Sequence, residues 1–177
     1  VVLNALPWAG LPSEAKRFWV VDGQQRVTTL TLLVCAIRDR LSQLCASDEK
    51  RAETLLSYTS QLLRNLNLKE NHRDRLVLQD KDAALLAPIV SGRWNGGTGS
   101  LIERAYAFFR TRLSAFDEEQ LVGLLSIMLT KFEAVWVTLQ EGDNAHRVFQ
   151  TLNAGGKKLN QSDLVRNYFF LLLGDLG

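Results

Sequence analysis

The stretch Val20-Val21-Asp22-Gly23-Gln24-Gln25-Arg26-Val27-Thr28-Thr29 decides how the rest of this sequence is interpreted. It joins a short apolar run, Phe18 to Val21, to the longest helical pattern in the chain. Such an order predicts a buried strand, a tight turn at Asp22-Gly23 and then the first turn of a helix. We therefore place the organising centre of the molecule at a strand-to-helix junction.

This junction has the chemistry of an anion site. The first N–H groups of a helix lack intrahelical partners, and the helix dipole adds about half a positive charge there. Arg26 can add a planar, two-pronged donor. Gln24 and Gln25 carry amides that donate and accept, and Asp22 carries a carboxylate. Because that carboxylate alone would repel a phosphate, a bridging divalent cation would explain its presence.

A purely structural interpretation of the same residues also stays open. Asp22 can serve as the N-cap of the helix and Gly23 as a turn glycine, with an ordinary first helical turn after them. Composition does not separate this interpretation from an anion site.

The remaining pattern predicts an α+β, helix-rich fold with a small N-terminal sheet and a helical body. Strands at 1–6 and 17–21 are expected to pair as a hairpin. Gln25 to Leu44 has apolar residues at steps of three and four, which indicates a central, largely buried helix. Further helices are predicted at Ser47–Ser60, Asp80–Ala87, Ser100–Ala115, Asp117–Met128 and Asp143–Leu152, and further strands at Leu62–Leu66, Arg75–Gln79 and Phe132–Leu139.

Two motifs resemble one protein family. Asp22-Gly23-Gln24-Gln25-Arg26, followed by Val-Thr-Thr-Leu, is similar to the signature of the GmrSD-type restriction endonuclease N-terminal domain, in the ParB/sulfiredoxin-like fold group. The second motif is Phe149-x-x-Leu152-Asn153-x-Gly155-Gly156-x-x-Leu159-x-x-x-Asp163-Leu164-x-x-Asn167. Because the two motifs stand in the expected order far apart in the sequence, the resemblance covers nearly the whole chain.

The resemblance implies a module that binds and hydrolyses a nucleoside triphosphate with Mg²⁺ and controls cleavage of modified or foreign DNA. Asp22 would then be a metal ligand or base, Gln24 or Gln25 would orient water, and Arg26 would hold phosphates; these four form the catalytic set. The implied nucleotide-binding set is Gly23, Arg26, Thr28, Thr29, Asn153, Lys157, Asp163, Arg166 and Asn167.

The second motif has two interpretations. It can be a helix–turn–helix corner with ordinary caps, in which Gly155-Gly156 ends one helix. Alternatively, Asn153, Lys157 and Arg166 can complete an anion site around Asp22–Arg26. Family members often carry Arg at the place of Gly155 and Pro at that of Lys158, and they have an earlier strand that is missing before Val1; these departures weaken the inference.

Length and composition limit the alternatives. The 177 residues suit a single domain at 1–177, with the sheet and central helix at 1–45 and a mainly helical part at 46–177. Twenty-one basic and nineteen acidic residues give a net charge of +2, which does not by itself indicate a nucleic-acid binder. The cysteine pair has no metal-binding spacing and no membrane-spanning segment is visible, so we expect a cytoplasmic protein. We also expect the chain to be a fragment of a longer protein.

Nuclease chemistry is not expected in this chain. Its two histidines, His72 and His146, are far apart, and no His/Cys metal cluster is present in the sequence. Family resemblance implies that DNA is met through the full-length protein and cut by a downstream HNH-like nuclease domain or partner chain. Whether the module is itself an enzyme stays open. The alternative is a non-catalytic DNA-binding or protein-docking module of the same fold, which basic side chains on one exposed face would favour.

Overall fold

The computed structural model describes residues 1–5, 18–65, 74–97, 99–133, 135 and 137–139. The fold is α+β and rich in helices, as the sequence predicts. In chain order the elements are β1 (Val2–Ala5), β2 (Phe18–Asp22), α1 (Gln24–Leu44), α2 (Glu49–Leu63), α3 (Asp80–Val90), α4 (Leu101–Leu113), α5 (Glu118–Thr130) and β3 (Val137–Leu139). They fall into two compact units, Val1–Gln24 with Ala134–Gly177, and Gln25–Glu133, each described by itself below.

The first unit contains a three-stranded sheet in the order β2-β1-β3. β1 pairs antiparallel with β2, where Leu3 faces Val20, so the predicted hairpin pairing is confirmed. β1 also pairs in parallel with β3, where Leu3 faces Thr138. The predicted strand Phe132–Leu139 was too long, because only Val137–Leu139 finds a partner strand to share its backbone hydrogen bonds.

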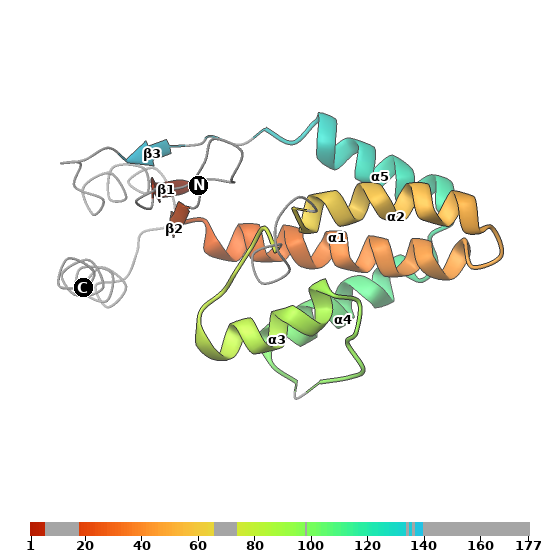
Figure 1. Cartoon of the computed structure of the whole chain (residues 1–177), viewed down its shortest axis with the longest axis horizontal. Helices are drawn as coiled ribbons and strands as arrows, with labels where there is room; N and C mark the ends of the chain where they lie inside the picture. The colour runs from red at the N-terminus through yellow and green to blue at the C-terminus, as the bar shows by residue number, and fades with distance from the viewer. Residues whose placement is uncertain (6–17, 66–73, 98, 134, 136, 140–177) are drawn as a thin grey trace. The chain divides into compact units, whose positions relative to one another are not determined.

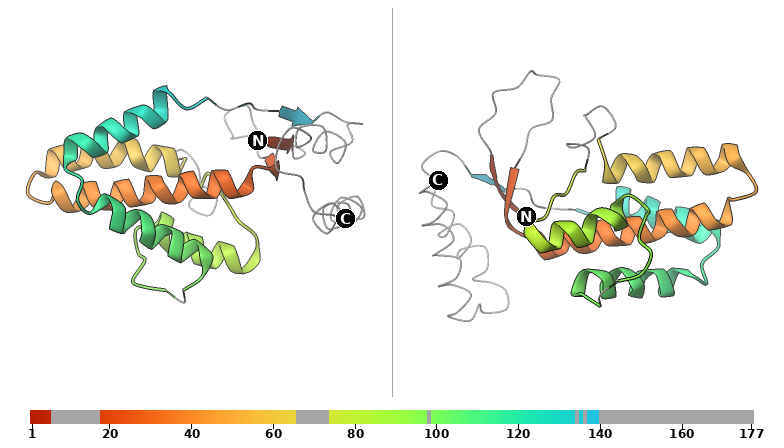
Figure 2. Two further views of the ribbon diagram at one scale, coloured as in Figure 1. Left: turned by 180° about the vertical axis from the view of Figure 1, so that it is seen from behind. Right: turned by 60° about the horizontal axis from the view of Figure 1, so that its bottom comes forward.

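Helix α1 runs through the middle of the second unit, with α2 along one side and α4 along the other (Figures 1 and 2). This position confirms the predicted central helix. Its buried side chains span more than one stripe because neighbours cover it from two sides. They are Leu32, Val34, Cys35, Ala36, Ile37 and Leu41. Leu44, at the end of the expected apolar series, is exposed at 36%.

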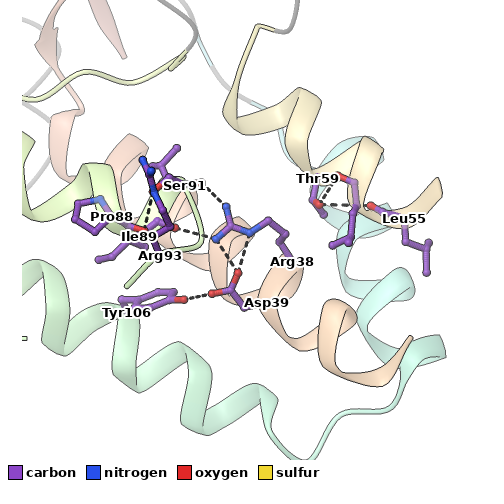
Figure 3. A network of polar contacts seen from close by, with 11 residues as sticks. Arg38, Asp39, Leu55, Thr59, Pro88, Ile89, Ser91, Arg93 and Tyr106 are labelled. Atoms are coloured by element: carbon purple, nitrogen blue, oxygen red, sulfur yellow. Dashed lines mark hydrogen bonds and ion pairs between the residues drawn. The ribbon is translucent and has the colours of Figure 1, made fainter. Parts of the chain in front are cut away.

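A polar network holds α3 and α4 against α1 (Figure 3). The Arg38 guanidinium donates to the carbonyl oxygen of Ile89 at 2.8 Å and also to that of Val90, at the end of α3. Arg38 pairs with Asp39 at 2.7 Å, and the Tyr106 hydroxyl of α4 donates to the same carboxylate. Thus one charged pair in a mostly apolar helix satisfies polar groups from two neighbouring helices.

The predicted end of α3 at Ala87 is wrong, because α3 continues through Pro88 to Val90. Proline removes one helix donor and disfavours helical geometry in the residue before it. Ile89 and Val90 are buried, and Arg38 binds their carbonyl oxygens. We attribute the three extra helical residues to this burial and to these tertiary hydrogen bonds, which no local signal reveals.

The region after α1 also differs from prediction. Asp48, not Ser47, caps α2 by accepting from the Arg51 backbone N–H at 3.1 Å. The helix then continues to Leu63, since that side chain is buried in the core, so the predicted strand Leu62–Leu66 is wrong. The predicted strand at 75–79 is also absent among these described residues. One isolated bridge joins Arg64 to Asp74, just before this stretch.

Helices α4 and α5 lie where the sequence predicts helices, and each begins with a capping box. Ser100 and Glu103 bond reciprocally at the start of α4, and Asp117 and Gln120 do the same at the start of α5. Such a box satisfies first-turn donors that would otherwise lack partners. The predicted helix at 143–152 and the second motif lie outside the described residues.

Candidate functional site

The candidate site begins where β2 ends at Asp22 and α1 begins at Gln24. Gly23 joins them with φ +94°, a conformation that L side chains rarely adopt. A Cβ at this position would lie 3.1 Å from the Val1 side chain. A glycine therefore meets both the backbone and the space requirements of the predicted strand-to-helix turn.

The position of Gly23 bears on the cap interpretation. Because α1 begins at Gln24, Gly23 rather than Asp22 occupies the position directly before the helix. Glycine has no side-chain oxygen with which to accept from the first-turn N–H groups. Asp22 lies one residue earlier, at the end of β2, where it is half-buried.

The first turn of α1 presents polar side chains to solvent. Gln24, Gln25 and Arg26 are all exposed. The Gln24 amide donates to the Val20 carbonyl oxygen at 2.8 Å, which ties it to β2. The Gln25 side chain makes no hydrogen bond within the part of the chain that the structure describes. The two glutamines, which the sequence could not tell apart, therefore differ in their side-chain hydrogen bonds.

The threonines of the predicted nucleotide-binding set stand farther along α1. Thr28 is half-buried and Thr29 is exposed. The Thr29 hydroxyl donates to the Gln25 carbonyl oxygen at 2.7 Å, a bond within the helix. Its oxygen can still accept, so a ligand would meet Thr29 mainly as an acceptor.

Comparison with known families decides the assignment. The model of the GmrSD restriction endonuclease N-terminal domain matches residues 4–170, nearly the whole chain. The chain belongs to this family. The predicted resemblance is thereby confirmed, and the domain is a part of a restriction endonuclease by descent. A search of curated proteins gave no significant match.

The second motif of this GmrSD N-terminal domain is not yet placed. Asn153, Lys157, Asp163, Arg166 and Asn167 all lie outside the described residues. Their predicted convergence with Asp22–Arg26 therefore stays a prediction.

The donors at the junction are compatible with Mg²⁺. Mg²⁺ is commonly held by one or two carboxylates, substrate phosphates and water rather than by an all-protein cage. Asp22 offers one such hard oxygen ligand. The described residues contain no group of three or more His, Cys, Asp or Glu side chains suited to a metal ion.

Cys35 packs in the hydrophobic core, whereas the Cys45 thiol donates to the Glu118 carboxylate at 3.7 Å. Cys35 and Cys45 are free thiols, and each is buried. Burial raises the pKa of the Cys35 thiol to about 12, so it stays protonated at neutral pH and is a poor nucleophile. No helix in the described part of the chain is long and apolar enough to cross a membrane.

The sequence did not indicate what Arg38, Asp39 and Arg40 do, since they read only as charged interruptions of an apolar helix. Arg38 and Asp39 hold α3 and α4, while Arg40 lines a groove with residues of α4. One signal was available. Charged residues inside a helix that is apolar on several stripes must find partners when that helix is buried.

Proposed function

We propose that the first turn of α1 binds the phosphates of a nucleoside triphosphate, and that this domain hydrolyses the nucleotide to regulate restriction of modified or foreign DNA. The observation that carries the proposal is the exposed Gln24-Gln25-Arg26 turn, set directly after a strand by a glycine at positive φ. Membership of the GmrSD family supports the restriction context.

The phosphate contacts follow from the position of this turn. Backbone N–H groups at a helix start, with the positive end of the dipole, attract anions. Arg26 is exposed on this turn and can donate two parallel hydrogen bonds to phosphate oxygens. Thr28 and Thr29, one turn later, would bind more distant parts of the nucleotide. Gly23 would let the backbone approach closely.

Hydrolysis requires a positioned water molecule and a group that accepts its proton. Gln25 is the better candidate for orienting water, because the Gln24 amide nitrogen already binds Val20. Asp22 would accept the proton, or would hold Mg²⁺ against the phosphates, where the ion neutralises their charge. Catalysis of this kind rests on positioning and electrostatic stabilisation.

Other parts of the system would complete the function. We propose that Asn153, Lys157, Asp163, Arg166 and Asn167 also contribute to nucleotide binding. DNA cleavage would come from a downstream HNH-like nuclease domain or a partner chain. The two free cysteines favour a reducing, cytoplasmic setting.

The test is equilibrium binding of ATP, GTP, CTP and UTP with Mg²⁺ to the parent chain and to Arg26→Gln. Loss of a charge-assisted phosphate contact should weaken binding about tenfold or more. Arg104→Gln is the matched control, since Arg104 is an exposed helical arginine of α4. Equal affinities of the parent and Arg26→Gln would refute the phosphate role. A parent that binds DNA without any nucleotide would favour the non-catalytic alternative.

A further inference from the structure

We propose that a groove between α1 and α4 is a second phosphate-binding site. The groove has a volume of about 370 Å³ and is lined by two alanines together with Arg40, Gln43, Trp94, Arg110, Thr111 and Ser114. This volume falls within the range of roughly 300–1,000 Å³ that is typical of small-molecule sites. Arg40 stands about 20 Å farther along α1 than Arg26, at the usual rise per residue.

The charged groups that line the groove are both cations. Arg40 comes from α1 and Arg110 from α4, and none of the lining residues is acidic. Among the described residues, no carboxylate forms an ion pair with either guanidinium. Arg40 donates only long hydrogen bonds, to the Phe116 carbonyl oxygen at 3.4 Å and to Gln43 Oε1 at 3.5 Å. Both guanidinium groups therefore keep donors for a ligand.

Aromatic stacking fixes the position of Arg110. Its guanidinium carbon lies 5.3 Å from the ring centre of Trp94 and 5.8 Å from that of Tyr106. The two rings also pack edge to face, with centres 5.1 Å apart. A cation–π contact does not use the hydrogen-bond donors of the guanidinium, so its N–H groups can still donate to a ligand. The groove thus has a cation whose orientation is set before a ligand arrives.

Trp94 does not supply a donor that a ligand can reach. Its indole Nε1 is buried and has no hydrogen-bond partner among the described residues. An indole N–H only donates, and a buried donor without a partner is costly. That N–H is closed off from solvent, so the donors that a phosphate in the groove can reach are those of Arg40 and Arg110, which the unprotonated phosphate oxygens accept.

The surrounding sequence also favours an anion. Between residues 88 and 116 the basic residues are Arg93, Arg104, Arg110 and Arg112, and the only acidic one is Glu103. The Glu103 carboxylate accepts from the Ser100 backbone N–H at 3.1 Å and from its hydroxyl at 2.9 Å. This local excess is hidden in the near-neutral charge of the whole chain. The phosphate could belong to a DNA backbone or to a free phosphate compound, because both present the same oxygens.

The test titrates inorganic phosphate and, separately, a short DNA duplex into the full chain by calorimetry. Every protein carries Arg26→Gln, so that the first turn of α1 contributes little. Arg40→Gln and Arg110→Gln should each weaken binding about tenfold. Arg112→Gln, which removes the same charge two residues later and outside the groove, should change it by about twofold or less. Thermal melts confirm that each variant is folded.

Two outcomes support the site and separate the sources. Phosphate binding without duplex binding assigns the groove to a free phosphate compound, whereas duplex binding that phosphate competes away assigns it to the DNA backbone. The site is excluded if neither probe binds the folded parent. It is also excluded if Arg112→Gln weakens binding as much as Arg110→Gln, because the attraction would then be diffuse.

Discussion

The first turn of α1 and the middle of the same helix use polar side chains in opposite ways. In the middle, Arg38 and Asp39 bind each other and groups of α3 and α4, so packing explains why they are there. In the first turn, Gln24, Gln25 and Arg26 are exposed. Exposed positions tolerate many residue types, so packing does not select these three. The difference teaches where to look for function: the half-buried charges stabilise the fold, and the polar side chains of the first turn face solvent.

The largest expected effect comes from disrupting the polar network in the middle of α1. Arg38→Met keeps most of the apolar stem but removes the charged donor to the Asp39 carboxylate and to the Ile89 and Val90 carbonyl oxygens of α3. We expect a loss of about 3 kcal/mol in the free energy of unfolding, measured by urea denaturation.

Arg51→Met is the control for Arg38→Met. Arg51 also forms an ion pair at 2.7 Å, with Glu118, but its side chain is 63% exposed. Exposed pairs contribute little to stability, so this variant should unfold near the parent's midpoint. Equal losses in the two variants would mean that burial does not determine how much these ion pairs contribute to the free energy of unfolding.

Tyr106→Phe should have the next largest effect. It removes the hydroxyl that donates to Asp39, and we expect a loss of about 2 kcal/mol at pH 7. Burial, reinforced by the hydrogen bond to Asp39 and its charge, raises the pKa of Tyr106 above its ordinary value. Above about pH 10 the unfolded chain loses this proton while the folded chain keeps it, so stability falls as pH rises.

The variant should therefore lack part of the alkaline loss. Unfolding measured from pH 8 to 11 should show a smaller decline in stability for Tyr106→Phe than for the parent. Cys35, whose pKa is about 12 in the fold, leaves a residual decline in both proteins. Parallel curves would show that Tyr106 does not titrate differently in the folded and unfolded states.

The smallest effect on stability is expected in the first turn. Gln25→Ala removes an exposed amide from a helix that alanine favours, so the free energy of unfolding should change by no more than about 0.5 kcal/mol. Under the proposed function the same change removes the group that orients water, and phosphate release should fall about tenfold or more. Melting curves and phosphate-release rates on the same samples would separate the two effects; a stable variant with unchanged release would remove Gln25 from the site.

Local signals predicted much of the fold. The strand–glycine–helix order, the central helix α1 and the places of α4 and α5 depend on residues close in sequence, and the structure confirms them. Tertiary contacts decided the errors. Continuation of α3 through Pro88 depends on burial and on Arg38, which lies far away in sequence.

The candidate site was predictable to the same extent. The motif placed Gly23 and the exposed polar turn, because a glycine at positive φ and a helix start are encoded locally. The different hydrogen bonding of the Gln24 and Gln25 side chains could not be predicted, since it depends on how β2 ends beside the helix. The stacking of Arg110 on Trp94 likewise joins residues from a loop and a helix that no short motif relates.

The most direct test of the central claim is phosphate release by Asp22→Asn beside its thermal melt. Asparagine has the size and shape of aspartate but is a poor base and a weak metal ligand. The account predicts that the parent releases phosphate from a nucleoside triphosphate with Mg²⁺, and that Asp22→Asn melts at the parent's temperature while release falls to background. An Asn variant as active as the parent would contradict the role of Asp22, and a parent that releases no phosphate from any of the four nucleotides would contradict the hydrolytic function.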